Sequence, residues 1–376
     1  MLRAHVEVLA SDGMEGRACP SRGCDLAADY ILAHFRAAGL ETQVQKTEAL
    51  FEIRRGDVVV HPKEAKLQPS ILLTDAKVEI DAEDRIVAGK RVLLEKTPEL
   101  GPIYKATGDV RLSHIPGGLR NILGVLKGRD PKLRETYVLV TAHYDHVGLR
   151  PDAEGDRVFN GANDNASGVS GLIEIARAIS TSATRPRRSI VFIAYFGEER
   201  GMVGSRYYAR NPVFPVAQTF AQVNFEQLGR PDDTEGLRIK GATVTGWDRS
   251  EVGKVLATAA TPSRVRIYKH EKFSEAFFER SDNEALAKLG VPAHTISVAY
   301  GFPDYHGLGD EASKLNYANM ATVTQALRRG VVALGNRRAS LTPRAGSPAV
   351  SAPKAGSSPA TPTPMRSKPS PKPPKG

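Results

Sequence analysis

Long apolar runs and helix-like repeats alternate through the middle of this chain. Residues 138–142 are apolar except for one threonine, and residues 190–196 are apolar throughout. Continuous apolar runs of this length are typical of strands buried on both faces of a parallel sheet. Between the two runs, apolar residues recur at the 3.6-residue spacing of a helix, at Val169, Leu172, Ile173, Ala176 and Ile179. The pattern therefore predicts an α/β fold.

The same reasoning predicts further elements on both sides of this segment. Strands are expected at 121–126, 138–142, 190–196, 221–225 and 293–298, and helices at 25–39, 166–180, 203–210 and about 318–334. Gly39 stands where a glycine commonly ends a helix. We expect a mixed, mostly parallel central sheet with helices on both faces.

Two segments depart from this pattern and set the expected domain boundaries. Residues 43–115 carry short β-like runs at 57–60, 70–73 and 90–94, separated by Gly, Pro and charged turns. They predict outer strands of the main sheet or a small β insertion. The expected organisation is an N-terminal helical segment at 1–42, a β-rich segment at 43–115, a core domain at 116–336 and a tail at 337–376.

The formal charge of +10 belongs mainly to the tail. Residues 337–376 hold eight Lys or Arg, no acidic residue and 10 of the 25 prolines, which leaves +2 of the +10 for residues 1–336. This composition predicts disorder, because it offers too little apolar surface to offset the entropy of ordering. The tail is either a solvated extension or a contact to anionic surfaces. The near-neutral body argues against specific nucleic-acid binding.

Both cysteines lie in one short loop. Cys19 and Cys24 are separated by four residues, so they are either a small disulfide or two free thiols in a turn. A disulfide would favour an oxidising compartment. Residues 1–7 lack the sustained apolar stretch of a signal peptide, and no run approaches the ~20 apolar residues of a membrane span.

Metal-binding side chains follow several of the predicted strands. His143 and Asp145 follow the first apolar run, Glu198 and Glu199 follow the second, and Glu226 follows 221–225. A small polar loop at 160–168 contains Asp164, and Tyr305 and His306 lie in a loop flanked by Gly and Pro. Sites in open α/β sheets lie beyond the carboxyl ends of the strands. Imidazole with carboxylate suits Zn²⁺, with Co²⁺ or Mn²⁺ as substitutes. Five such ligands with one shared carboxylate suit two ions about 3.5–4 Å apart.

In their order along the chain, these motifs resemble the M28 zinc aminopeptidases, which are co-catalytic di-zinc exopeptidases. The resemblance covers roughly 1–335. Its elements are the segment Leu9 to Arg17, His-x-Asp, Asn-Asp-Asn-Ala-Ser-Gly, Glu-Glu, Asn-x-Glu-x-x-Gly-Arg, Ser-Asp and Tyr-His-x-x-x-Asp. It implies hydrolysis of the first peptide bond of peptides with a free N-terminus, and an extracytoplasmic location.

The resemblance also assigns roles to residues. The expected metal ligands are His143, Asp164 and Glu226 for one zinc, and Asp164, Glu199 and His306 for the other. Glu198 is the expected general base. Asp145 is expected to accept the second ring N–H of His143, and Tyr305 to donate a hydrogen bond to the oxyanion. Asp310 is expected to anchor the loop after His306.

Some alternatives stay open. His146 rivals His143 as the ligand, although its position fits a loop better than a strand end. The chain departs from the family at Glu226, which is often Asp there, and at the residues directly after Ser281-Asp282. The rival functions are a glutaminyl cyclase with one zinc and a non-catalytic binding module of the same fold. The pattern is silent on oligomeric state and residue preference.

Overall fold

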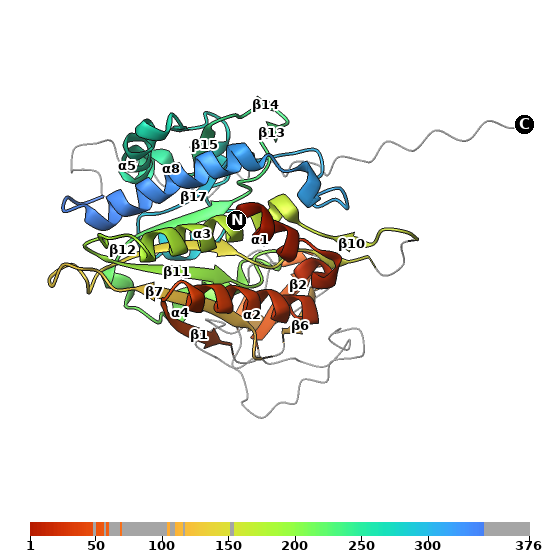
Figure 1. The fold of residues 1–376 in the computed structure, drawn as a ribbon. Helices are drawn as coiled ribbons and strands as arrows, with labels where there is room; N and C mark the ends of the chain where they lie inside the picture. The colour runs from red at the N-terminus through yellow and green to blue at the C-terminus, as the bar shows by residue number, and fades with distance from the viewer. Residues whose placement is uncertain are drawn as a thin grey trace, which may run out of the picture. The chain divides into compact units, whose positions relative to one another are not determined.

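The computed structural model describes residues 1–47, 117–150 and 154–341, together with the backbone of short strands within 50–115. Residues Met1–Thr342 form one compact unit, drawn as a ribbon in Figure 1. The predicted runs at 70–73 and 90–94 and the tail from 342 onward lie outside the described residues. Among the described residues, we find no helix with both the length and the apolar character needed to cross a membrane.

An eight-stranded sheet runs through the described part of the chain. Its strands, in spatial order, are β1 (Glu41–Lys46), β7 (Arg120–Leu126), β11 (Ser189–Tyr195), β8 (Tyr137–His143), β12 (Thr219–Glu226), β17 (Ala293–Ser297), β15 (Gly241–Val244) and β16 (Arg266–Tyr268). The four central strands β11, β8, β12 and β17 are parallel, whereas β1–β7, β7–β11 and β15–β17 are antiparallel pairs. The prediction of a mixed, mostly parallel sheet is confirmed.

In the part of the chain that the structure describes, short strands outside this sheet form four small sheets. They are β2 (Leu50–Arg55) with β3 (Val58–Val59) and β6 (Val110–Ile115), β4 (Gln68–Pro69) with β5 (Tyr104–Lys105), β9 (Gly148–Leu149) with β10 (Val158–Phe159), and β13 (Asp232–Asp233) with β14 (Gly236–Leu237). Of the segment 43–115, therefore, β1 joins the edge of the main sheet, and β2, β3 and β6 pair separately from it.

Helices cover both faces of the main sheet, as predicted. They are α1 (Leu2–Leu9), α2 (Arg22–Ala37), α3 (Gly168–Ser180), α4 (Val203–Arg210), α5 (Val252–Ala260), α6 (Phe273–Ala276), α7 (Glu284–Ala287) and α8 (Tyr317–Asn336). The α2 helix begins three residues before its predicted start because the Ser21 hydroxyl accepts the Cys24 N–H at 3.2 Å and caps it. It ends at Ala37, and Gly39 takes a left-handed φ of 71° beyond it.

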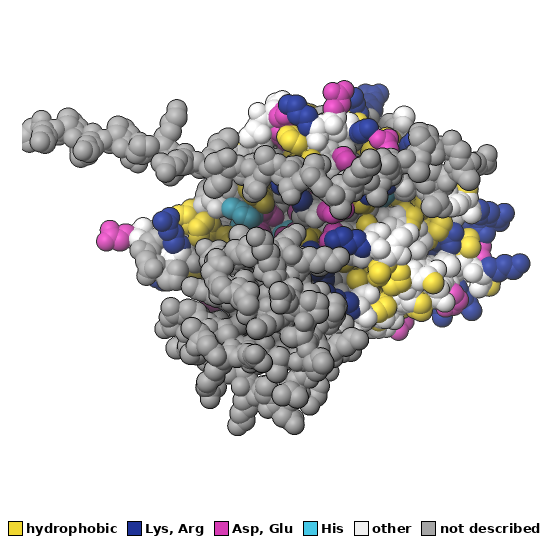
Figure 2. All heavy atoms as spheres, turned by 180° about the vertical axis from the view of Figure 1, so that it is seen from behind, with side chains coloured by type: hydrophobic (Ala, Val, Ile, Leu, Met, Phe, Trp, Pro, Cys, Tyr) yellow, Lys and Arg dark blue, Asp and Glu magenta, His cyan; other side chains and the backbone are white. Residues whose placement is uncertain are grey.

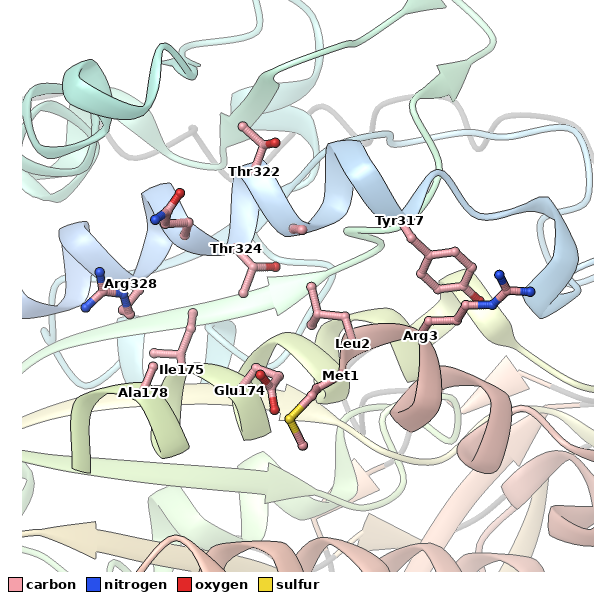
Figure 3. Close-up of a pocket in the computed structure, with 12 residues that line it drawn as sticks. Met1, Leu2, Arg3, Glu174, Ile175, Ala178, Tyr317, Thr322, Thr324 and Arg328 are labelled. Atoms are coloured by element: carbon pink, nitrogen blue, oxygen red, sulfur yellow. The ribbon is translucent and has the colours of Figure 1, made fainter. Parts of the chain in front are cut away.

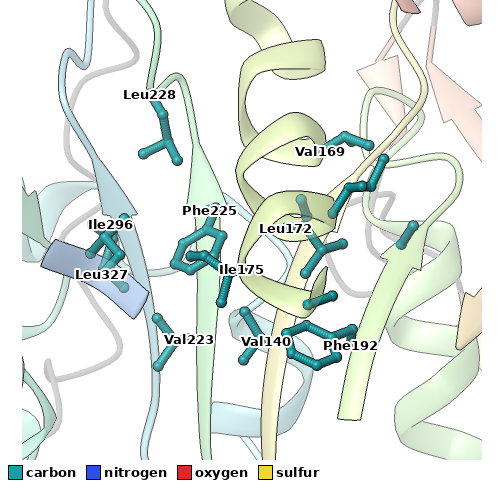
Figure 4. Packing of buried hydrophobic residues seen from close by; sticks show 14 of the residues in the cluster. Val140, Val169, Leu172, Ile175, Phe192, Val223, Phe225, Leu228, Ile296 and Leu327 are labelled. Atoms are coloured by element: carbon teal, nitrogen blue, oxygen red, sulfur yellow. The ribbon is translucent and has the colours of Figure 1, made fainter. Parts of the chain in front are cut away.

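Alternate residues of each central strand enter different cores, as the two-residue repeat of a strand requires. On β8, Val138 and Val140 join a large cluster with α2, α3 and α8, whereas Tyr137 and Leu139 join a smaller cluster on the opposite face with Tyr208 of α4. Figure 4 shows side chains of α3 meeting those of β8, β11 and β12 in the large cluster. This double burial explains why the strands read as continuous apolar runs and fixes their ends in space.

Figure 2 shows one face of the molecule by residue type. Basic and acidic side chains both occur across its described part, as the nearly neutral charge of residues 1–336 leads one to expect.

A buried histidine on β17 predicts acid sensitivity. The Nδ1 of His294 lies 2.7 Å from the Thr245 carbonyl, and its Nε2 lies 2.6 Å from the Ser250 hydroxyl. Burial lowers the pKa of His294 from 6.5 to about 4. As the pH falls, this histidine therefore binds a proton in the unfolded chain before it does so in the folded one. The contribution of neutral His294 to the free energy of unfolding is complete above pH 6.5 and is lost between pH 6.5 and pH 4. The whole loss is about 3.5 kcal/mol at about 1.4 kcal/mol per pKa unit, and about 2–3 kcal/mol of it falls between pH 7 and pH 4.5.

The measurement compares wild type with His294→Gln by urea unfolding at pH 7 and pH 4.5. The two proteins share every other titrating group, so the change in their stability difference isolates His294. We expect the free energy of unfolding of the variant to fall by about 2–3 kcal/mol less than that of wild type. Equal losses in both proteins would refute this assignment.

Candidate metal centre

Three neighbouring parallel strands deliver the predicted residues to one edge of the sheet. His143 is the last residue of β8, and Glu226 is the last residue of β12 beside it. Glu198 and Glu199 follow β11, which flanks β8 on the other side. Strand register thus brings together side chains that lie far apart in the sequence. Asp164 arrives from the segment before α3, and His306 from the loop before α8.

The five predicted ligands form two groups that share one carboxylate. The Nε2 of His143 lies 3.3 Å from Glu226 Oε2 and 3.5 Å from Asp164 Oδ1. The Nε2 of His306 lies 3.2 Å from Asp164 Oδ2 and 3.1 Å from Glu199 Oε2. The two oxygens of Asp164 therefore face different histidines. Both groups have ligand atoms close enough together to hold an ion.

The loop that carries Asp164 is held by its neighbours in sequence and by a distant carboxylate. The carboxylate of Asp310 accepts the backbone N–H groups of Asn163 and Asp164 at 2.9 Å each. Asn165 accepts the Gly168 and Gln227 N–H groups through its Oδ1 at 3.1 and 3.2 Å. Asp310 was expected to anchor its own loop, which follows His306. Its carboxylate instead holds the loop that carries Asp164.

Asp145 joins the two adjacent glutamates. Its Oδ1 accepts the Glu198 N–H at 3.1 Å, and its Oδ2 accepts the Glu199 N–H at 3.2 Å. The predicted contact to His143 takes a different form. The ring Nδ1 lies 3.2 Å from the Asp145 carbonyl oxygen and 3.6 Å from its carboxylate, and the second distance is too long for a hydrogen bond. Asp145 therefore orients both the histidine and the glutamate pair.

Ser281 positions Glu226 from a segment whose role the sequence left open. Its hydroxyl donates to Glu226 Oε1 and accepts the Asn224 side-chain N–H at 2.8 Å. Since Oε1 is occupied in this way, Oε2 is left facing His143. The Ser-Asp motif thus supports a predicted ligand, and the neighbouring Asp282 is fully buried.

Opposing charges shift the pKa values of these side chains. Burial raises the pKa of Asp164, but hydrogen bonds to His143 and His306 outweigh it and hold that pKa far below its ordinary range. Burial lowers the pKa of His306, but Asp164 and Glu199 outweigh it and raise that pKa to about 10. Burial also raises the pKa of Glu198 well above 4.5. Such closely packed carboxylates favour bound cations.

Glu198 and Tyr305 line a cavity of about 310 Å³ next to these groups. Its other walls include Phe277, Thr295 and Tyr300. Tyr305 is 49% exposed, and its ring stacks on that of His306 with the ring centres 4.0 Å apart. The cavity thus gives Glu198 access to a molecule that reaches the shared carboxylate.

Another hollow, of about 530 Å³, lies among α1, α3 and α8. In Figure 3, Leu2 and Ile175 point toward it, and Tyr317 lies at its edge beside Arg3. Among the described residues that line it, only Glu174 carries a carboxylate, so it lacks the paired ligands of the first cavity.

Two side chains of the site were given no role by the sequence. Arg17 is buried, and its guanidinium donates to the carbonyl oxygens of Leu9, Tyr144, Asn160 and Gly161. It therefore clamps the N-terminal segment to the loops after β8 and before Asp164. In the sequence, the only indication of this role was that Arg17 ends the segment Leu9 to Arg17 that resembles the family. One arginine in a motif does not show which carbonyl groups its side chain contacts.

His146 is the other side chain. Considered in the sequence only as a rival of His143, it lies within ligand distance of Asp164, Glu199 and His306. The sequence predicted that His146 lies on a loop, and it does. The structure adds that this loop brings His146 back to the ligand groups.

Comparisons with known proteins agree with this geometry. The sequence model of peptidase family M28 matches residues 121–331. A probable zinc metalloprotease of Pyrenophora tritici-repentis is 32% identical over 142 residues, which are 37% of this chain and 31% of that relative. The matched segment therefore spans about a third of that protein's length.

Solved structures show the same fold. A zinc aminopeptidase from Bacillus subtilis superimposes with a TM-score of 0.60 at 16% identity, covering 90% of this chain and 95% of that one. A glutaminyl cyclase of Porphyromonas gingivalis gives a TM-score of 0.56 at 15% identity, covering 88% and 96%. Because an aminopeptidase and a glutaminyl cyclase share this fold, the fold alone does not determine the reaction.

Proposed function

Because this chain belongs to peptidase family M28, we propose that it is a di-zinc aminopeptidase that removes the first residue of peptides. The observation that carries the proposal is the pair of contacts made by Asp164, whose Oδ1 faces His143 and whose Oδ2 faces His306. A carboxylate that presents one oxygen to each of two ligand groups is suited to bridge two ions.

The donor set fits zinc. His143 and Glu226 would hold one ion together with Asp164, and Glu199 and His306 would hold the other. Imidazole nitrogen and carboxylate oxygen are ordinary zinc donors, and three protein ligands per ion leave a position for substrate or water. When bound, the ions would polarise the scissile carbonyl and ease deprotonation of the attacking water.

Glu198 would move the proton. It lines the cavity beside the ligand groups, and its burial raises its pKa well above the 4.5 of an ordinary glutamate. A base whose pKa lies nearer the working pH can take a proton from the attacking water and return it to the leaving amine. Asp145 would keep this base aimed, because it holds the backbone N–H of Glu198.

Tyr305 would act on the opposite side of the scissile bond. Its ring is fixed by stacking on His306, and it lines the same cavity as Glu198. We assign its hydroxyl to donate a hydrogen bond to the oxygen that gains negative charge as the carbonyl is attacked. The cavity walls at Phe277, Thr295 and Tyr300 would then receive the N-terminal residue of the substrate.

The test pairs metal analysis with a panel of substrates. Aminoacyl amides and dipeptides should be hydrolysed, and N-acetylated copies should not, because an aminopeptidase requires a free N-terminus. About two zinc ions per chain are expected after loading and removal of excess metal.

Other results would each point to a rival. Cyclisation of peptides that begin with glutamine, with about one zinc per chain, would replace the proposal with a glutaminyl cyclase. Absence of both zinc binding and turnover would favour a binding module. Equal turnover of free and N-acetylated peptides would contradict an aminopeptidase of any metal content.

We also propose an extracytoplasmic location. The structure pairs Cys19 with Cys24, the first of the two alternatives for these residues, and both are buried, Cys24 in the first turn of α2 and Cys19 shortly before the helix. Structural disulfides persist mainly in oxidising compartments. Detection of free thiols in protein isolated under thiol-trapping conditions would oppose this location.

A further inference from the structure

His146 lies in the second ligand group, although it was not counted among its ligands. The residue is 1% exposed, and its Nδ1 lies 3.0 Å from Oε1 of Glu199. The other oxygen of that carboxylate, Oε2, lies 3.1 Å from Nε2 of His306. Each oxygen of Glu199 therefore has its own histidine. Of the two histidines, His306 also contacts Asp164, with its Nε2 3.2 Å from Oδ2.

The imidazole ring of His146 is fixed in place. It packs against Gly161, where an added Cβ would lie 2.5 Å from ring atoms, and it meets the His306 ring edge-on with centres 5.5 Å apart. A side chain at position 161 would displace the ring, so this glycine is required for the close approach. The contact to Glu199 is therefore set by the packing of the loop.

The hydrogen-bonding partners of the ring decide between two roles. An ionised carboxylate only accepts hydrogen bonds, so the Nδ1 facing Glu199 carries the proton. The buried Nε2 then presents a lone pair, and it has no partner among the described residues. If Nδ1 coordinated an ion instead, the proton would lie on Nε2 as a buried donor without an acceptor. A buried N–H group without an acceptor is costly. The geometry therefore favours a hydrogen bond from Nδ1 to Glu199 over coordination of an ion by Nδ1.

We propose that His146 is a positioning residue that holds Oε1 of Glu199 and leaves Oε2 alone to bind the second ion. The inference rests on the proposed two-zinc centre. A carboxylate can bind an ion through one oxygen or both, and a hydrogen bond to one oxygen fixes this choice. Partners of this kind commonly raise metal affinity 10–100-fold.

The experiment measures the affinity of the full chain for each zinc ion by competition with a chromophoric chelator. His146→Ala should weaken the second ion about 10–100-fold and leave the first unchanged. His146→Asn places an amide N–H where Nδ1–H stood and should restore most of the affinity. Retained binding of the first ion shows that each variant is folded. His34→Ala, which removes a histidine on α2, is the matched control and should bind both ions as wild type does.

Absorption spectra of the Co²⁺-loaded proteins supply a second readout. Because the proposal keeps His146 off the ion, the d–d bands should be similar in wild type and His146→Asn. Spectra that change equally in both variants, with no rescue by Asn, would overturn the proposal in favour of direct coordination. Wild-type affinity for both ions in His146→Ala would overturn it outright. A wild-type chain that binds fewer than two ions would instead defeat the two-zinc proposal, and the wild-type titration alone reveals this.

Discussion

Glu198→Gln is expected to keep its metal and lose about 10³–10⁴-fold in kcat, at the upper end of what general acid–base catalysis contributes. The amide has the same size and cannot accept the proton of the attacking water. Glu198 belongs to neither ligand group that shares Asp164, and its backbone N–H to Asp145 survives the change. Single-turnover kinetics on a dipeptide, with zinc analysis of the same sample, measures both quantities.

Two comparisons make this result specific to proton transfer. Tyr305→Phe keeps the ring that stacks on His306 and loses only the hydroxyl, so a smaller loss of about 10²-fold is expected. Glu251→Gln alters a glutamate that pairs with Lys254 away from the site and should leave kcat unchanged. Full activity of Glu198→Gln would remove Glu198 from the mechanism.

Asp164→Ala is expected to release both ions and reduce activity to that of the metal-free protein. Each ion would lose one of three protein ligands in a single substitution, because the two oxygens of Asp164 face separate histidines. The loop should persist, since Asp310 holds it through the backbone N–H groups of Asn163 and Asp164 and not through the substituted side chain. Zinc per chain, measured after dialysis, reports the loss.

Glu226→Ala is the informative partner of this variant. Glu226 belongs to only one ligand group, so it should release one ion and retain the other. Asp248→Ala, which removes an exposed carboxylate paired with Lys269, controls for the loss of an acidic group and should keep both ions. If Asp164→Ala and Glu226→Ala released the same amount of zinc, Asp164 would not be a bridge.

The central strands could be predicted because both of their faces are buried. A strand such as β11 reads as one apolar run, and its end marks where polar chemistry begins. The edge of the sheet gave no comparable pattern. Strands β15 and β16 have four and three residues, too few for a periodicity to be recognised, and the α5 helix between them was missed with them.

The residues of the site were also predictable only in part. Residues at strand ends could be grouped from sequence because neighbouring parallel strands finish at one edge. Asp310 and Arg17 act through backbone groups of distant loops, and such contacts leave no periodic pattern in the chain. His146 was passed over for a related reason. Its position in the sequence says that it lies on a loop, but not that the loop turns back to Glu199.

The hydrogen bonds from Asn163 and Asp164 to Asp310 have a consequence for the order of events during biosynthesis. The ribosome releases His143 and Asp164 long before it reaches His306 and Asp310. Until then, the Asp164 loop lacks the carboxylate that accepts its N–H groups, and the second ligand group lacks its histidine. Under the proposed two-zinc centre, a nascent chain would therefore be able to complete the first ligand group before the second, and the second ion would have to wait for His306.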